Sequence, residues 1–89
     1  MKEGRPAALV TVVETKGSAP REAGARMVVY ADGTGVGTIG GGAVEYEAQN
    51  LAMVAIDEGL PRRYTPNLAQ DLGMACGGMM DIFIEPLVR

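Results

Sequence analysis

The hydrophobic positions first outline the strands of this chain. Residues 7–15 are rich in β-branched side chains and almost continuously apolar, which predicts a central strand covered on both of its faces. Residues 81–85 alternate polar and apolar side chains, which predicts a final strand that is ended by Pro86. A short strand is also expected over residues 62–65.

A hairpin is predicted in the first half of the chain. Its first strand covers residues 27–30, and its returning strand covers residues 36–39. Between them lies Asp32-Gly33, a pair that is typical of tight hairpin turns. Two strands that follow each other in the sequence are therefore expected to pair.

One segment, residues 43–58, has the spacing of a helix. Gly59 provides a C-terminal stop, and Pro61 follows shortly after it. Residues 67–79 are expected to form a loop or a partial helix. The apolar residues of the main helix form one stripe: Val44, Ala48, Leu51, Ala52, Ala55 and Ile56.

These elements predict an α+β fold, in which a small mixed β-sheet of about five strands carries one main helix on a face. The chain has 89 residues, which is enough for one small domain. It contains no internal repeat, linker or low-complexity tract. We therefore expect residues 1–89 to form a single domain.

Composition adds an expectation about assembly. Hydrophobic residues make up 47% of the chain but aromatic residues only 4%, so the core must be built from aliphatic side chains and six methionines. A chain this short and apolar leaves apolar surface uncovered. This favours a homodimer or larger oligomer, or a partner protein.

Charge and cysteine content exclude several classes of function. A net charge of −3 argues against binding a nucleic-acid backbone, which requires a positive surface. A single cysteine cannot form an internal disulfide, and the charged N-terminal segment lacks the apolar core of a signal peptide. No apolar run approaches the length of a membrane span. We expect a cytoplasmic protein that contacts neither nucleic acid nor membrane.

The cysteine itself is the first candidate for chemistry. Cys76 lies among glycines in a chain that has no histidine. The absence of imidazole excludes Ser–His and Cys–His pairs and histidine metal ligands. The flanking Gly77 and Gly78 allow backbone N–H groups to point at the sulfur, which would make it more reactive. A buried and inert cysteine is the alternative.

Three consecutive glycines, Gly40, Gly41 and Gly42, join a predicted strand to the helix. Glycines let the backbone approach a ligand closely, and the N–H groups at the start of a helix attract anions. No Gly-Lys-Ser/Thr sequence follows, so this is not a P-loop. The alternative is a tight turn whose glycines serve packing, with Glu45 complementing the helix dipole.

Basic residues gather in one loop of an otherwise acidic chain. Arginine suits phosphate or carboxylate ligands, and Ser18 can add a hydroxyl group. The alternative is a solvated loop whose cations pair with Glu14 and Glu22. The basic residues are Lys16, Arg21 and Arg26.

These features combine into three motifs in a fixed order. Together they resemble the N-terminal domain of the XdhC/CoxI family, over roughly residues 4–87. The resemblance implies a maturation factor, and not an enzyme, for molybdenum hydroxylases such as xanthine dehydrogenase and carbon monoxide dehydrogenase. The motifs are Gly17-Ser18-Ala19-Pro20-Arg21, Gly37-Thr38-Ile39-Gly40-Gly41-Gly42 with Val44-Glu45, and Gly73-Met74-Ala75-Cys76-Gly77-Gly78 followed by residues 81–86.

The resemblance also implies a cargo and partners. Members of that family are understood to bind the molybdenum cofactor (molybdopterin) transiently, to support its sulfuration and to deliver it to the apo-enzyme. The expected partners are therefore a molybdenum hydroxylase apo-enzyme and, for sulfuration, a sulfurtransferase. Typical members continue into a C-terminal Rossmann-like domain. We expect that domain to be absent here, so that either a separate protein supplies it or this short form has a narrower task.

The cofactor site implied by the resemblance draws on all three motifs. Ser18 and Arg21 are expected to contact phosphate or polar pterin groups. The turn Gly40–Gly42 is expected to give close backbone approach, with Glu45 beside it.

The third motif is expected to supply a sulfur. Cys76, in a loop shaped by Gly77 and Gly78, is expected to contact the molybdenum or a sulfur of the cofactor, which makes it the one candidate metal ligand. Two alternatives stay open. One is a protein–protein docking module that never touches the cofactor, and the other is a sulfur carrier that uses Cys76 as a persulfide.

Overall fold

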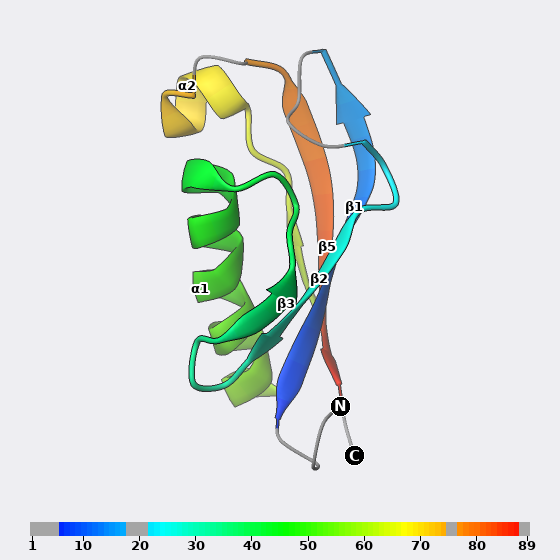
Figure 1. Cartoon of the computed structure of the whole chain (residues 1–89), viewed down its shortest axis with the longest axis vertical. Coiled ribbons are helices and arrows are strands. Elements are labelled where there is room, and N and C mark those ends of the chain that lie inside the picture. The colour runs from blue at the N-terminus through cyan, green and yellow to red at the C-terminus, as the bar shows by residue number, and fades with distance from the viewer. Residues whose placement is uncertain (1–5, 18–21, 75–76, 88–89) are drawn as a thin grey trace.

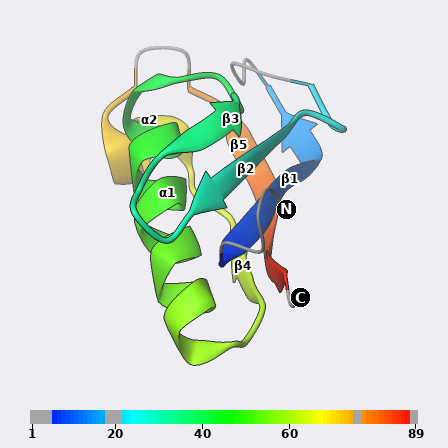
Figure 2. The same cartoon turned by 60° about the horizontal axis from the view of Figure 1, so that its bottom comes forward.

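The computed structural model describes residues 6–17, 22–74 and 77–87, which form a five-stranded sheet with both helices on one face (Figure 1). After a rotation, α1 still lies across that same face (Figure 2). The strand order is β3-β2-β1-β5-β4, so β1 is the central strand. In chain order the elements are β1 (Ala7–Lys16), β2 (Arg26–Tyr30), β3 (Gly35–Gly37), α1 (Gly42–Glu58), β4 (Arg62–Tyr64), α2 (Leu68–Leu72) and β5 (Met79–Leu87).

The predicted α+β class, with five strands and one main helix, is confirmed. The sheet was expected to be mixed, but every pairing in its described part is antiparallel. Parallel neighbours normally arise when a helical crossover links adjacent strands. Here α1 links β3 to β4, which lie at opposite edges of the sheet, so this crossover creates no parallel pair.

The longest pairing joins the first and last strands of the described chain. It runs from Ala7 opposite Leu87 to Lys16 opposite Met79, with a β-bulge between Val12 and Glu14. A bulge increases the local twist of a strand and re-aims its end. The pairing therefore holds the end of β1 against the start of β5.

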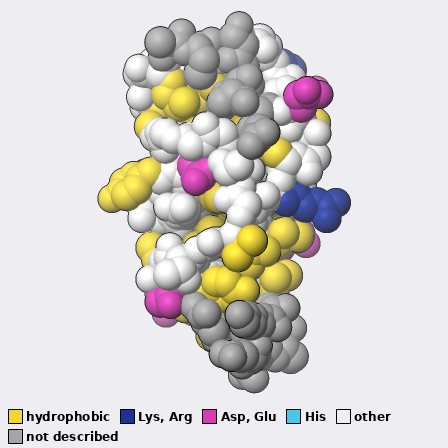
Figure 3. All heavy atoms as spheres, in the orientation of Figure 1, with side chains coloured by type: hydrophobic (Ala, Val, Ile, Leu, Met, Phe, Trp, Pro, Cys, Tyr) yellow, Lys and Arg dark blue, Asp and Glu magenta, His cyan; other side chains and the backbone are white. Residues whose placement is uncertain are grey.

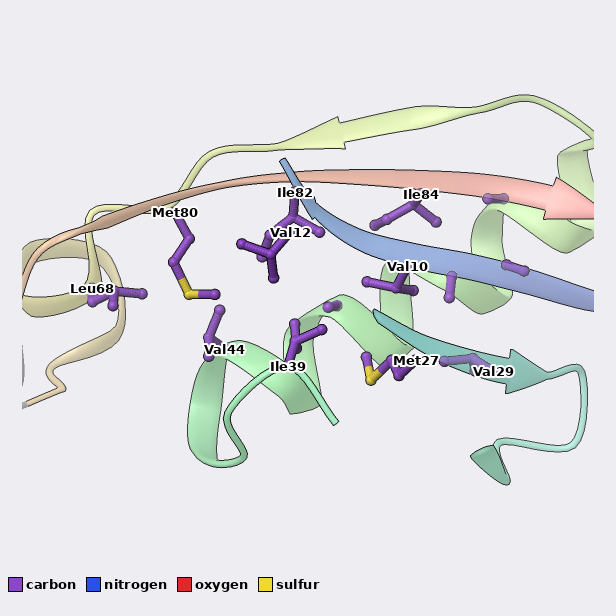
Figure 4. Packing of buried hydrophobic residues seen from close by; sticks show 14 residues of the cluster. Val10, Val12, Met27, Val29, Ile39, Val44, Leu68, Met80, Ile82 and Ile84 are labelled. Atoms are coloured by element: carbon purple, nitrogen blue, oxygen red, sulfur yellow. The ribbon is translucent and has the colours of Figure 1, made fainter. Parts of the chain in front are cut away.

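The core lies between the sheet and α1 (Figure 4). Val10 and Val12 of β1 and Ile82 and Ile84 of β5 are fully buried and belong to this core. The small side chains of α1 let the helix approach the sheet closely, which compensates for the shortage of aromatic residues. Four residues of the predicted stripe are fully buried: Val44, Ala48, Ala52 and Ala55. The other two, Leu51 and Ile56, are partly buried against the core.

The prediction that β1 is covered on both faces is wrong. On the face away from α1, Leu9 and Thr11 are only half-buried, and Val13 is 48% exposed. Both helices pack on the opposite face of the sheet (Figure 1). A continuous apolar run therefore marks a strand that is central in its sheet but covered on one side.

The prediction that Pro86 ends the final strand is also wrong. β5 continues to Leu87, and Pro86 pairs with Ala8. β4 pairs only with residues 82–84 of β5, so only β1 flanks the strand at Pro86. The missing N–H of proline is tolerated where one side of a strand has no partner.

The returning strand of the hairpin is shorter than predicted. β3 ends at Gly37, and Ile39 leaves the sheet to become fully buried in the core. Thr38 and Ile39 instead lead into the turn that starts α1.

Within the described ranges, no helix combines the length and the apolar character needed to cross a membrane.

Candidate functional site

The three sequence motifs come together at one end of the molecule, where β1 ends and both α1 and β5 begin (Figure 1). A Cβ atom built on Gly17 would lie only 3.1 Å from the Cα of Gly78, so the first and third motifs touch through their backbones. A Cβ atom on Gly42 would lie 3.5 Å from the Cε of Met74, which brings the second motif beside the third. This end is the candidate site.

One carboxylate holds the glycine turn before α1 in place. Oε1 of Glu45 accepts hydrogen bonds from the hydroxyl group of Thr38 at 2.5 Å and from the N–H groups of Ile39 and Gly41, each at 3.0 Å. The N–H of Gly40 donates to Oγ1 of Thr38 at 3.0 Å. The helix N-cap, Gly41, has no side chain that could cap the helix, so Glu45 reaches back from the first turn in its place.

This network changes what the glycines can offer to a ligand. The N–H groups of Gly40 and Gly41 already donate to side chains of the chain itself. What remains is space: a Cβ atom on Gly41 would meet nothing within 4 Å. The turn therefore presents an open backbone surface without side chains. Glu45 holds the turn in this conformation through its hydrogen bonds.

The third motif is anchored on both sides of Cys76. Before it, the N–H of Met74 donates to the carbonyl of Leu68 at 2.9 Å. After it, the N–H of Gly77 donates to the carbonyl of Met74 at 3.2 Å, and the carbonyl of Gly78 accepts from the N–H of Leu68 at 2.9 Å. Both ends of this loop are therefore tied to α2.

Three predicted site residues, Ser18, Arg21 and Cys76, lie outside the described residues. The structure places the residues that flank them: Gly17 precedes Ser18, and Gly77 follows Cys76. Because Gly17 and Gly78 touch, the two loops start from adjacent points at the candidate site.

A small cavity lies beside this contact. Its volume is about 180 Å³, below the roughly 300–1,000 Å³ of typical small-molecule sites, so it can hold only part of a larger ligand. Thr65 and Asp81 were not singled out as site residues from the sequence, because only the pairing of β5 with both β1 and β4 brings them near Lys16. The lining residues are Glu14, Thr15, Lys16, Thr65, Met79, Met80 and Asp81.

An ion pair sets the charge on one wall of the cavity. Nε and Nη2 of Arg63 donate to the two carboxylate oxygens of Asp81 at 2.9 and 2.7 Å. These hydrogen bonds lower the pKa of the Asp81 carboxyl below its usual value, and they raise the pKa of Arg63. Asp81 is 20% exposed and Arg63 64%, so solvent screens the pair and its contribution to stability is small.

Replacing Arg63 with methionine is expected to make the stability of the protein less dependent on acid pH. The low pKa of Asp81 stabilises the folded state above about pH 4, the usual value for an aspartate, and this contribution disappears as the pH falls through the lower folded pKa. The difference in stability between wild type and Arg63→Met should therefore be constant near neutral pH and shrink below about pH 4. Urea unfolding at a series of pH values measures it. A difference that stays the same down to pH 2 would contradict this account.

Across residues 6–17, 22–74 and 77–87, no three carboxylate, imidazole or thiol groups gather into a metal-binding cluster. The predicted metal ligand, Cys76, is outside those ranges.

Comparisons with known proteins match this chain over most of its length. The model of the XdhC and CoxI family matches residues 1–65. The Escherichia coli K12 protein YqeB is 43% identical over 84 residues, which cover 90% of this chain and 15% of YqeB. The molybdenum cofactor insertion chaperone PaoD, also of Escherichia coli K12, is 37% identical over 90 residues, which cover 98% of this chain and 28% of PaoD.

A solved structure shares the fold. The crystal structure of a xanthine dehydrogenase from Bacillus halodurans matches 96% of this chain with a TM-score of 0.85 and 28% sequence identity. The match covers 27% of that protein. The chain thus spans less than a third of the length of each of these three relatives.

Proposed function

Because the chain belongs to the XdhC and CoxI family, we propose that it binds the molybdenum cofactor transiently, supports its sulfuration and helps to insert it into a molybdenum hydroxylase. The observation that carries the proposal is the convergence of three glycine-containing motifs at one end of the molecule. The name of PaoD, a molybdenum cofactor insertion chaperone, supports the same role. The role is that of an accessory protein and needs no catalytic residue.

The candidate site fits such a cargo in several respects. A pterin that carries a phosphate needs close backbone approach and at least one cation. The open surface at Gly41 allows close backbone approach, and Lys16 at the cavity supplies a cation. Ser18 and Arg21 would add a hydroxyl group and a planar guanidinium that can bind phosphate through two hydrogen bonds.

Cys76 is proposed to contact the molybdenum or a sulfur of the cargo, because thiolates suit soft metals and sulfur ligands. The two residues that follow, Gly77 and Gly78, have no side chains that could obstruct the proposed contact.

The small volume of the cavity limits how much of the cargo it can enclose. About 180 Å³ accommodates only part of a pterin that carries a nucleotide. The cargo would therefore lie across the end of the molecule, with one side exposed. That arrangement suits transient binding and transfer to an apo-enzyme or a sulfurtransferase, both proposed as partners.

An anaerobic binding experiment tests the proposal. The purified protein is mixed with molybdenum cofactor and separated by gel filtration, and molybdenum and pterin are assayed in the protein peak. Wild type is expected to retain both. Arg21→Ala is expected to retain at least about tenfold less, since a hydrogen bond to a charged group contributes roughly 1.5–3 kcal/mol. Cys76→Ser is expected to lose molybdenum retention.

The matched control is Arg62→Ala. Arg62 pairs with Glu58 at the C-terminal end of α1, away from the candidate site. This variant also removes one cation but should retain the cofactor like wild type. If wild type retains no cofactor, the docking-module alternative replaces the proposal. If Arg21→Ala and Cys76→Ser both retain it fully, the proposed residue roles are wrong.

A further inference from the structure

The face of the sheet opposite α1 is an apolar surface with charged corners. Leu9 of β1 lies opposite Val28 of β2 on one side and Glu85 of β5 on the other. Two residues along β1, Thr11 lies between Arg26 and Phe83 in the same way. Residues two apart on a strand share a face, so these two rows lie side by side on the open face.

The centre of this open face is apolar and incompletely covered. Leu9, Val28 and Phe83 are half-buried, and Val36, which pairs with Val28 at the sheet edge, is 65% exposed. In the space-filling view, hydrophobic side chains gather over the β2–β3 hairpin and the start of β1 (Figure 3). Exposing such an apolar patch to water does not stabilise a monomer, and patches of this kind are typical of interaction surfaces.

Two opposite charges stand at diagonal corners of this patch. Arg26 is on β2 in one row, and Glu85 is on β5 in the other, with β1 between them. Two strand spacings and one two-residue step separate their backbones by about 12 Å. Neither residue belongs to the ion pairs seen among the described residues, which join Arg62 to Glu58 and Arg63 to Asp81. The other arginine of this face, Arg63, is already paired with Asp81.

The geometry points to a second copy of this chain as the occupant of the open face. A two-fold axis in the plane of the interface, passing between the corners, places Arg26 of each copy on Glu85 of the other. Closed two-fold contacts are self-complementary in this way, with each residue pair occurring twice. The two ion pairs flank an apolar centre of Leu9, Val28 and Phe83. The cavity of the candidate site borders this face through Asp81, but dimerisation is measured without cofactor, so the test does not depend on cofactor binding.

Charge reversal and mixing test the inference. Light scattering coupled to gel filtration should show a wild-type dimer at about 50–100 μM protein. Arg26→Glu alone creates two Glu–Glu contacts, and Glu85→Arg alone creates two Arg–Arg contacts. Each variant alone is expected to raise the dimer Kd at least tenfold. An equimolar mixture restores two opposite-charge pairs, so the mixture is expected to dimerise again.

The matched control is Arg62→Glu. Arg62 lies opposite Ile84, a core residue, so it belongs to the face that carries the helices. This variant has the same charge change and should remain a dimer.

Three outcomes would overturn the inference: a monomeric wild type at 100 μM, single variants that dimerise like wild type, or a mixture that stays monomeric while wild type dimerises. A monomeric wild type would leave the open face to a different protein. Circular dichroism of each variant confirms that the exposed substitutions leave the fold intact.

Discussion

Replacing Glu45 with alanine is expected to lower the free energy of unfolding by roughly 2–4 kcal/mol. A single carboxylate oxygen accepts from the hydroxyl group of Thr38 and from two backbone N–H groups, those of Ile39 and Gly41. Leaving a partly buried donor without an acceptor costs about 1–3 kcal/mol, and water near the turn compensates for part of the sum. Urea unfolding followed by circular dichroism measures the loss.

Two further variants isolate the cause of that loss. Glu45→Gln keeps an oxygen acceptor without the charge and should cost only about 1 kcal/mol. Glu47→Ala removes a carboxylate two residues along the same helix, for which no hydrogen bond to Thr38, Ile39 or Gly41 is seen, and it should cost less than about 0.5 kcal/mol. If Glu45→Ala and Glu47→Ala destabilise equally, the turn does not depend on Glu45.

Gly37→Ala is expected to cost roughly 2–4 kcal/mol for a different reason. The φ of Gly37 is +90°, and an added Cβ atom would lie 2.7 Å from the carbonyl oxygen of Arg26 and 3.3 Å from the Cα of Met27. A left-handed conformation costs an L-residue about 1–2 kcal/mol, and a forced shift in a packed region adds about 1–3 kcal/mol. The obstacle is the backbone of β2, so no side-chain rotation relieves it. Thermal unfolding should show a clear drop in Tm.

Gly33 supplies the matched control. Its φ is also +90°, but the atom nearest to an added Cβ would be Sδ of Met53 at 3.8 Å, an ordinary contact. Gly33→Ala therefore carries only the conformational cost of about 1–2 kcal/mol. The difference between the two variants measures the clash between β3 and β2. Equal losses would show that β3 can move away from β2 without cost.

Much of the fold follows from periodicity in the sequence. The helical stripe of residues 43–58 became α1, with the predicted alanines buried, and the alternation of residues 81–85 placed Ile82 and Ile84 in the core. Those patterns are visible because residues three or four apart in a helix, and residues two apart in a strand, lie on the same face and share the same environment. The open face of β1 was missed because Leu9 and Val28 are as apolar as core residues, although no layer of the described residues covers them.

The site is harder to derive from sequence. The glycines and Glu45 stood out as local features, but the role of Glu45 depends on Thr38, seven residues earlier, and on the path of the turn between them. The contact between Gly17 and Gly78 depends on the register of β1 against β5, which residue type alone does not specify. Long-range pairing is therefore the part of the site that only the three-dimensional structure reveals.

The pairing of β1 with β5 also has a consequence for how the protein is made. β1 leaves the ribosome before the other described elements and β5 leaves after them, so β1 lacks this neighbour until all the residues between the two strands have been made. At about 5–20 residues per second, the 72 positions from Ala7 to Met79 take roughly 4–14 s to synthesise. During that time the apolar edge of β1 is exposed to other nascent chains. Folding of the sheet is therefore expected to be a late event, completed only once β5 has emerged.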